Sequence, residues 1–103
     1  MNLEQEDWKS QLNNDGNAII IDVRTEEEWS DGIIPGAMLL DIYKNEEFLS
    51  GIKSLEKTKN YYVYCKAGGR SQQACSIMNQ HGIPNAYNLI GGITKWTGDR
   101  IKP

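Results

Sequence analysis

The chain has 103 residues and a net charge of −3, with 39% hydrophobic residues and both signs of charge distributed along it. This length and composition suffice for one globular core, so residues 1–103 are expected to form a single domain. The charge gives no electrostatic reason to expect nucleic acid or an anionic membrane as a partner. No apolar run approaches the roughly 18 residues that a membrane span requires.

Cysteine and histidine are scarce, with two cysteines and one histidine in the chain. Two cysteines do not form a disulfide framework, and no group has metal-ligand spacing, so neither a metal nor another cofactor is expected. The first residues lack the basic flank and the apolar run of a signal peptide. The expected compartment is therefore the reducing cytoplasm.

The first third of the chain predicts a helix, a strand and a second helix. Residues 3–13 favour a helix, and the apolar, β-branched run over 18–23 favours a strand covered on both faces. Thr25 and Glu28 have the spacing of a capping box, which predicts a short helix that begins at Thr25. The acidic run 26–28 is interpreted as solvated surface that complements the helix dipole, not as a metal site.

The middle of the chain continues the alternation. A loop over residues 32–37 leads into a short strand at 38–40. Between Lys44 and Leu55 the apolar residues fall on one face of a helix. Tyr61–Tyr64 favours a strand, because tyrosine and valine fit a pleated, buried surface.

The last third predicts a helix from Ser71 to Gln80, a strand over 85–90 and a short helix over 93–97. Alternating strands and helices on this short period predict an α/β fold. Its central sheet is expected to be mostly parallel, with four to five strands and helices on both faces. Ligands bind such sheets beyond the carboxyl ends of the strands. Cys65, the segment 22–24 and the Gly91-Gly92 turn are all expected at this edge.

The stretch from Cys65 to Ser71 is the candidate catalytic segment. It joins the end of a strand to the start of a helix by a short loop, whose members after the cysteine are Lys66, Ala67, Gly68, Gly69, Arg70 and Ser71. Backbone N–H groups of such a loop converge on one point, and the helix start adds positive charge. Cationic neighbours and a helix N-terminus lower the pKa of a thiol. Cys65 is therefore predicted to be an activated thiolate in an anion-binding loop.

The roles of the surrounding residues are less sharply defined. Arg70 either faces substrate or ties the loop to the body; the second role is expected, with Asp22 as its partner. Lys66 either attracts substrate or is plain surface. Ser71 is expected to be a helix N-cap, with a hydroxyl contact to the sulfur species on Cys65 as the lesser alternative. Arg24 is expected to be structural, and Cys75 is interpreted as a small buried hydrophobe, with a resolving thiol as the alternative.

Four motifs in order resemble those of single-domain rhodaneses and together cover nearly the whole chain. They are Asp22-Val23-Arg24 with Glu28, Gly32 through Ala37, Cys65 through Ser71, and Gly91-Gly92-Ile93 with Trp96. The resemblance implies a rhodanese-like three-layer fold and a cysteine that carries sulfane sulfur as a persulfide. One departure is Ile33, where the family often has histidine; that position is taken as structural.

The resemblance predicts an enzyme that moves sulfur from thiosulfate or a persulfide donor to cyanide or a thiol through a persulfide on Cys65. A protein sulfur donor or acceptor is a further candidate partner. The alternative is a sulfur-carrier or redox-signalling module with low turnover of small molecules. Phosphatase or arsenate reductase activity is less favoured, because only four residues separate Cys65 from Arg70, where tyrosine phosphatases have five.

Overall fold

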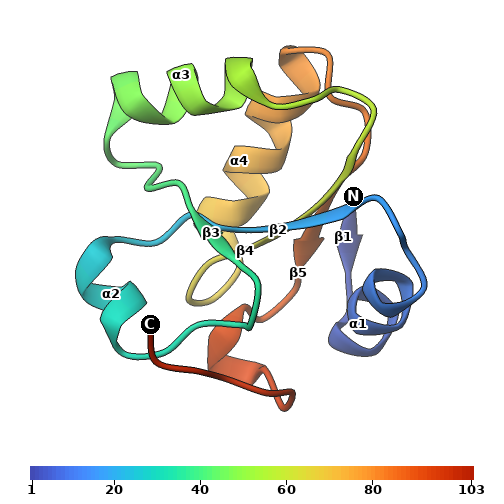
Figure 1. Cartoon of the computed structure of the whole chain (residues 1–103), viewed down its shortest axis with the longest axis vertical. Coiled ribbons are helices and arrows are strands. Elements are labelled where there is room, and N and C mark those ends of the chain that lie inside the picture. The colour runs from blue at the N-terminus through green and yellow to red at the C-terminus, as the bar shows by residue number, and fades with distance from the viewer.

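The computed structural model describes residues 1–103 and is built around one sheet (Figure 1). The strands are β1 Asn2–Leu3, β2 Ala18–Asp22, β3 Met38–Leu39, β4 Asn60–Tyr64 and β5 Ala86–Leu89. The helices are α1 Gln5–Asn13, α2 Glu26–Ser30, α3 Asn45–Ser54, α4 Gly69–Gln80 and the 3₁₀ helix η1 Ile93–Lys95. The five strands lie in the order β1-β5-β4-β2-β3, and every neighbouring pair is parallel.

Each face of the sheet carries its own apolar cluster, because successive side chains of a strand point to opposite sides. From β4, Tyr61 and Val63 join the cluster that α3 and α4 cover, whereas Tyr62 and Tyr64 join the cluster of α1 and η1. In Figure 1, α3 and α4 lie above the strands and α1 lies below them. The predicted three-layer fold, with a parallel sheet covered on both faces, is thus confirmed.

Several boundaries differ from those predicted. The helix expected over residues 3–13 begins at Gln5, because Asn2 and Leu3 pair with Asn88 and Leu89 as an edge strand. Two residues are too few to show strand periodicity in a sequence. Helix α4 begins at Gly69 and not at Ser71, since Gly68 is its N-cap and Gly69 already belongs to its first turn.

The order of the strands places the ends of β2 and β4 side by side. Asp22, the last residue of β2, pairs with Tyr64, the last residue of β4. Beyond this level, β2 continues into α2, and β4 continues into the Cys65 loop and α4. The crossover to β3 and the crossover to β5 run in opposite directions from here, which makes this a topological switch point of the kind where α/β sheets bind ligands.

The longest helix of the structure, α4, has 12 residues. None of the helices combines the length and the apolar character that crossing a bilayer would require.

Candidate active site

Cys65 follows the last residue of β4, and its sulfur lies inside the loop that leads to α4. The backbone N–H of Gly68 donates to Sγ at 3.0 Å, and the Ser71 hydroxyl lies 3.3 Å from Sγ. Gly68 has φ +108°, a left-handed conformation that glycine adopts without the strain of a Cβ. This conformation turns its amide toward the sulfur, as an anion-binding loop requires.

The surroundings of Cys65 act on its pKa in opposite directions. Burial raises the pKa of the thiol, but the Ser71 hydroxyl and the amides of Ser71, Gly68 and Ala67 stabilise the anion. The donors prevail, and the pKa of Cys65 lies below the ordinary thiol value. By contrast, burial raises the pKa of Cys75 to about 11, so the second thiol stays protonated at neutral pH.

A second glycine turn fixes the entry of the loop. The N–H of Ile93 donates to the Cys65 carbonyl at 3.0 Å, and the N–H of Thr94 donates to the Lys66 carbonyl at 3.1 Å. Gly92 has φ +58°, and a Cβ there would stand 2.4 Å from the Lys66 carbonyl oxygen. Position 92 therefore requires glycine, because the backbone of the turn and the backbone of Lys66 approach more closely than a side chain at that position would permit.

The expected partner of Arg70 is wrong: Arg70 binds Glu28 and not Asp22. Its Nη1 and Nη2 donate to the two carboxylate oxygens of Glu28 at 2.7 and 2.8 Å. The guanidinium carbon of Arg70 also lies 5.4 Å from the centre of the Tyr43 ring. A bidentate pair between α2 and α4 holds the end of the loop, so the predicted structural tie exists with a different carboxylate.

Asp22 is unavailable to Arg70 because Arg24 occupies its carboxylate. Arg24 Nη2 donates to Asp22 Oδ2 at 2.7 Å, and Arg24 Nε lies 3.0 Å from both carboxylate oxygens. Both residues are buried, and Arg24 also donates to the Gly32 carbonyl at 2.8 Å. This geometry matches a structural role for Arg24, which braces the end of β2 against the loop at residue 32.

The loop residues divide into an inner and an outer set. Gly68 and Ser71 are buried beside Cys65, whereas Lys66, Ala67 and Gly69 are exposed. The prediction that Ser71 is a helix N-cap is wrong, because Gly68 holds that position and Ser71 lies in the first turn. This places the Ser71 hydroxyl under the helix start, facing the sulfur. Lys66 makes no ion pair, so its side chain remains free at the surface.

Sequence reasoning missed Asn88 at the end of β5. Its side chain is 4% exposed and contacts the Ser71 hydroxyl and the Gly68 carbonyl. An asparagine within an apolar strand is an available signal, because a buried amide needs hydrogen-bond partners. The sequence could not name those partners, which come from α4 and β1.

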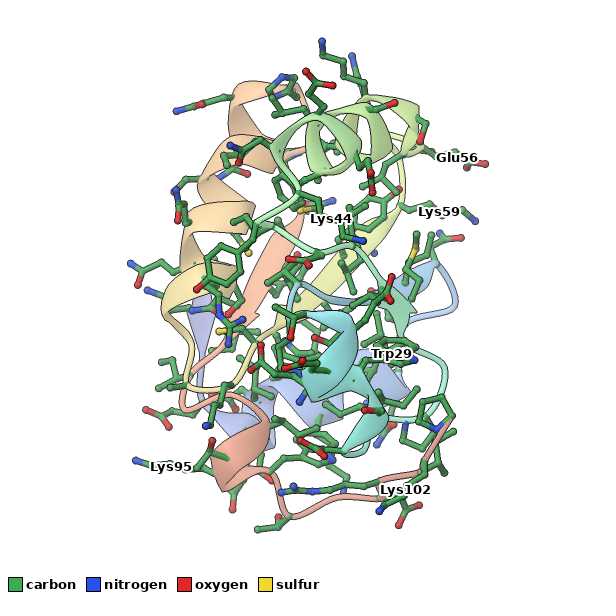
Figure 2. The ribbon with its side chains drawn as sticks, turned by 90° about the vertical axis from the view of Figure 1, so that its left-hand side faces the viewer. Trp29, Lys44, Glu56, Lys59, Lys95 and Lys102 are labelled. Carbon is green, nitrogen blue, oxygen red and sulfur yellow. The ribbon has the colours of Figure 1, made fainter.

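Access to the sulfur is narrow. Cys65 is 1% exposed, with the larger apolar cluster on one side and the donors of the loop on the other. Figure 2 looks onto α2, which carries Trp29, with the start of α3 near Lys44 above it and α4 alongside. A pocket of about 220 Å³ beside the loop is lined by loop backbone at residues 67–69 and does not include Cys65. A donor therefore has to present a slender terminal atom to this sulfur.

Known proteins resemble this chain in sequence and in structure. The family model described as "Rhodanese-like domain" matches residues 5–99. A protein named "Sulfurtransferase" from Allochromatium vinosum is 32% identical over 94 residues, covering 91% of this chain and 85% of that protein. A "Putative sulfur carrier protein YrkF" from Bacillus subtilis is 29% identical over 90% of this chain, but this region is only 49% of that protein.

A solved structure also resembles this chain in its three-dimensional fold. The crystal structure of a rhodanese-like domain protein from Staphylococcus aureus has a TM-score of 0.79 and 32% sequence identity. The match covers 95% of this chain and 91% of that protein. The motifs, the parallel sheet and the family match agree, and the chain belongs to the rhodanese-like domain family.

Proposed function

We propose that this protein is a sulfurtransferase that moves sulfane sulfur from thiosulfate or a persulfide donor to cyanide or a thiol. The observation that carries the proposal is the pair of donors on Cys65 Sγ, the Gly68 amide at 3.0 Å and the Ser71 hydroxyl at 3.3 Å. They stabilise the anionic form of the sulfur and so lower its pKa. Membership of the family and its sulfurtransferase relatives support transferase chemistry in general terms.

The proposed reaction is a double displacement through a covalent intermediate. The Cys65 thiolate attacks the sulfane sulfur of the donor, and the bond to the rest of the donor breaks. With thiosulfate, sulfite leaves with the electron pair of that bond, and Cys65 holds a persulfide anion. Cyanide then attacks the outer sulfur, thiocyanate leaves, and the Cys65 thiolate is restored. The amides of the loop stabilise negative charge on sulfur in both steps.

The arrangement of Arg70 favours sulfur transfer over phosphoryl transfer. Four residues separate Cys65 from Arg70, which makes a shorter loop than that of tyrosine phosphatases. Both terminal nitrogens of Arg70 donate to the carboxylate of Glu28. The site therefore lacks both the longer loop of a tyrosine phosphatase and an unpaired guanidinium to bind a phosphoryl group.

The first test is the mass of the protein after treatment with a sulfur donor. We expect one added sulfur atom, about 32 Da by intact mass, which cyanide removes while thiocyanate forms. Cys65→Ser should abolish the added mass and lower thiocyanate formation by at least about a thousandfold. Cys75→Ser is the matched control and should behave as the unchanged protein. Equal thiocyanate formation by Cys65→Ser and the unchanged protein would reject the mechanism.

A second candidate, a sulfur-carrier module, is favoured by the burial of the sulfur. With Cys65 only 1% exposed, small donors reach it slowly, whereas a docked partner could present a persulfide directly. The relative named as a putative sulfur carrier fits this alternative. A stable persulfide that cyanide discharges only over hours would favour the carrier. Rapid multiple turnover would favour the enzyme.

The remaining parts of the proposal concern setting and partners. We take residues 1–103 as one rhodanese domain, because both apolar clusters share the same sheet. Both cysteines are free, which fits the reducing cytoplasm as its compartment. The proposed partners are a small sulfur donor and a thiol or cyanide acceptor, with a protein donor or acceptor in the carrier alternative. Neither nucleic acid nor a membrane is part of the proposal.

A further inference from the structure

Asn88 lies at the centre of a buried hydrogen-bond network behind the Cys65 loop. Its Nδ2 donates to Asn2 Oδ1 at 2.9 Å and to the Gly68 carbonyl at 3.2 Å. Its Oδ1 accepts from the Ser71 hydroxyl. Asn88 thereby touches the same two residues, Gly68 and Ser71, that donate to the sulfur.

The orientation of the Asn88 amide follows from its partners. The Gly68 carbonyl can only accept a hydrogen bond, so it must face the NH₂ group of Asn88. The same NH₂ group also donates to Asn2 Oδ1, so the orientation of Asn88 sets that of the Asn2 amide. Asn88 Oδ1 is then fixed toward Ser71 Oγ, and it presents an acceptor to that hydroxyl and no donor.

The Ser71 hydroxyl has a single proton but three acceptors around it. They are Asn88 Oδ1, the Gly68 carbonyl at 3.2 Å and Cys65 Sγ at 3.3 Å. A proton donated to one acceptor is withheld from the others. A neutral thiol sulfur is a weak acceptor, whereas a carboxamide oxygen is a good one, so the hydroxyl donates to Asn88 Oδ1 while Cys65 is protonated.

We propose that Asn88 is a positioning residue that competes with Cys65 for the single proton of the Ser71 hydroxyl. When the sulfur is neutral, Ser71 donates to Asn88. When the sulfur is anionic, Ser71 turns toward it, and Asn88 Oδ1 is left without that hydrogen bond in a buried site. Asn88 thus limits how far the sulfur anion is stabilised.

The inference deepens the proposed function and rests on it. A thiolate that is stabilised too strongly is a weaker nucleophile, and the best attacking thiol has a pKa near the ambient pH. A competing acceptor at Ser71 would keep Cys65 anionic yet reactive toward a sulfane sulfur. The Gly68 amide, which has no competitor at its N–H, supplies the constant part of the stabilisation.

Other ionisable groups lie near the sulfur, and all of them except Cys75 stay in place in the test. Arg70, on α4, acts on Cys65 by its charge and is paired with Glu28 from α2. Cys75, also on α4, interacts electrostatically with Cys65. Exposed Lys66 lies next in sequence, and the buried Asp22–Arg24 pair lies at the end of the neighbouring strand.

The test is the pH dependence of Cys65 alkylation by iodoacetamide, read by intact mass in a Cys75→Ala background. This measurement needs no sulfur donor, so it is independent of whether the proposed transferase activity is found. Ser71→Ala removes a donor and should raise the pKa of Cys65. Asn88→Leu frees the hydroxyl for sulfur and should lower it, with alkylation at pH 6 rising about three- to tenfold. Asn2→Ala removes one acceptor of the Asn88 NH₂ group, while the Gly68 carbonyl still fixes the amide, so this control should leave the pKa of Cys65 unchanged.

The double variant Ser71→Ala/Asn88→Leu separates the proposal from a purely structural role. If the two residues share one proton, Asn88→Leu has no effect once Ser71 is alanine. If Asn88 only holds the loop in shape, Asn88→Leu raises the pKa of Cys65 as Ser71→Ala does, and the proposal is overturned. An unchanged titration in Asn88→Leu overturns it as well. Should Asn88→Leu fail to fold, Asn88→Ala removes the same acceptor with a smaller side chain and gives the same sign test.

Discussion

Glu28 serves two neighbours with one carboxylate. Its Oε1 accepts from the Thr25 amide at 3.2 Å and from Arg70 Nη1 at 2.7 Å, while Oε2 accepts from Arg70 Nη2. Arg70 is the main reason that the pKa of Glu28 falls from 4.5 to about 2, with Thr25 contributing and burial opposing. A single residue thus joins the start of α2 to the end of the Cys65 loop.

The first prediction follows from this lowered pKa. Glu28→Gln should reduce the free energy of unfolding at pH 7 by about 1–2 kcal/mol, a value discounted because the pair is partly solvated. The pKa is lower in the folded state, so the stabilisation is present above about pH 4.5 and is lost as the pH falls toward 2. Urea unfolding at pH 7 and pH 3 measures it, and roughly half of the difference should be gone at pH 3.

Glu27→Gln is the matched control, because Glu27 is exposed and its carboxylate forms no ion pair. It should change stability by less than about 0.5 kcal/mol at either pH. A Glu28→Gln variant as stable as this control at pH 7 would show that the ion pair adds nothing to the fold.

At the scale of elements, α2 is a short helix that depends on its cap. It has five residues and no buried side chain, so apolar packing does little to hold it. The Thr25 side chain accepts from the Glu28 amide at 3.3 Å, and the Glu28 side chain accepts from the Thr25 amide. The predicted capping box is therefore present, and it also aims Glu28 at Arg70.

We predict that Thr25→Ala lowers the free energy of unfolding by about 1 kcal/mol, whereas Thr25→Ser keeps the cap and loses much less. Because α2 carries Glu28, Thr25→Ala should also make the effect of Glu28→Gln smaller than in the unchanged protein. Chemical denaturation of the four variants measures both quantities. Strictly additive effects would mean that the cap and the ion pair act independently.

At the scale of the whole molecule, distant segments converge on the Cys65 loop. The turn between β5 and η1 donates hydrogen bonds to the backbone of the loop, and α2 pairs with Arg70 at the end of the loop. Asn2 in β1 accepts a hydrogen bond from Asn88, which contacts the loop. The segments that meet here come from the two ends and the middle of the chain. The loop is thus held by the complete sheet and its connections, not by its own sequence.

The Gly91-Gly92 turn gives the prediction at this scale. Gly92→Ala should destabilise the protein by at least about 2 kcal/mol, because φ is +58° and the new Cβ would meet the Lys66 carbonyl oxygen. Thermal unfolding measures the loss, and the midpoint of Cys65 alkylation in the folded protein should rise toward the ordinary thiol value. Gly16→Ala is the control, since a Cβ there meets nothing within 4 Å. Equal melting temperatures for the two variants would contradict this account of the turn.

Much of the fold was accessible from local pattern. Continuous apolar runs predicted strands covered on both faces, and the order of strands and helices predicted the parallel sheet. Local sequence patterns also predicted the capping box at Thr25 and the position of Cys65 at the end of a strand. These features depend on residues a few positions apart, which interact through the geometry of a single turn or strand.

The sequence by itself therefore determined the periodicity of the elements, the parallel architecture and the placement of Cys65 in a glycine-containing loop. Only the tertiary structure decided that Arg70 pairs with Glu28, that Asp22 belongs to Arg24, and that Asn88 lies beneath Ser71. The physical reason is that each of these choices depends on which of several competing partners comes within hydrogen-bond distance. That distance is set by strand order and helix packing between segments far apart in the chain, and short sequence patterns do not encode it.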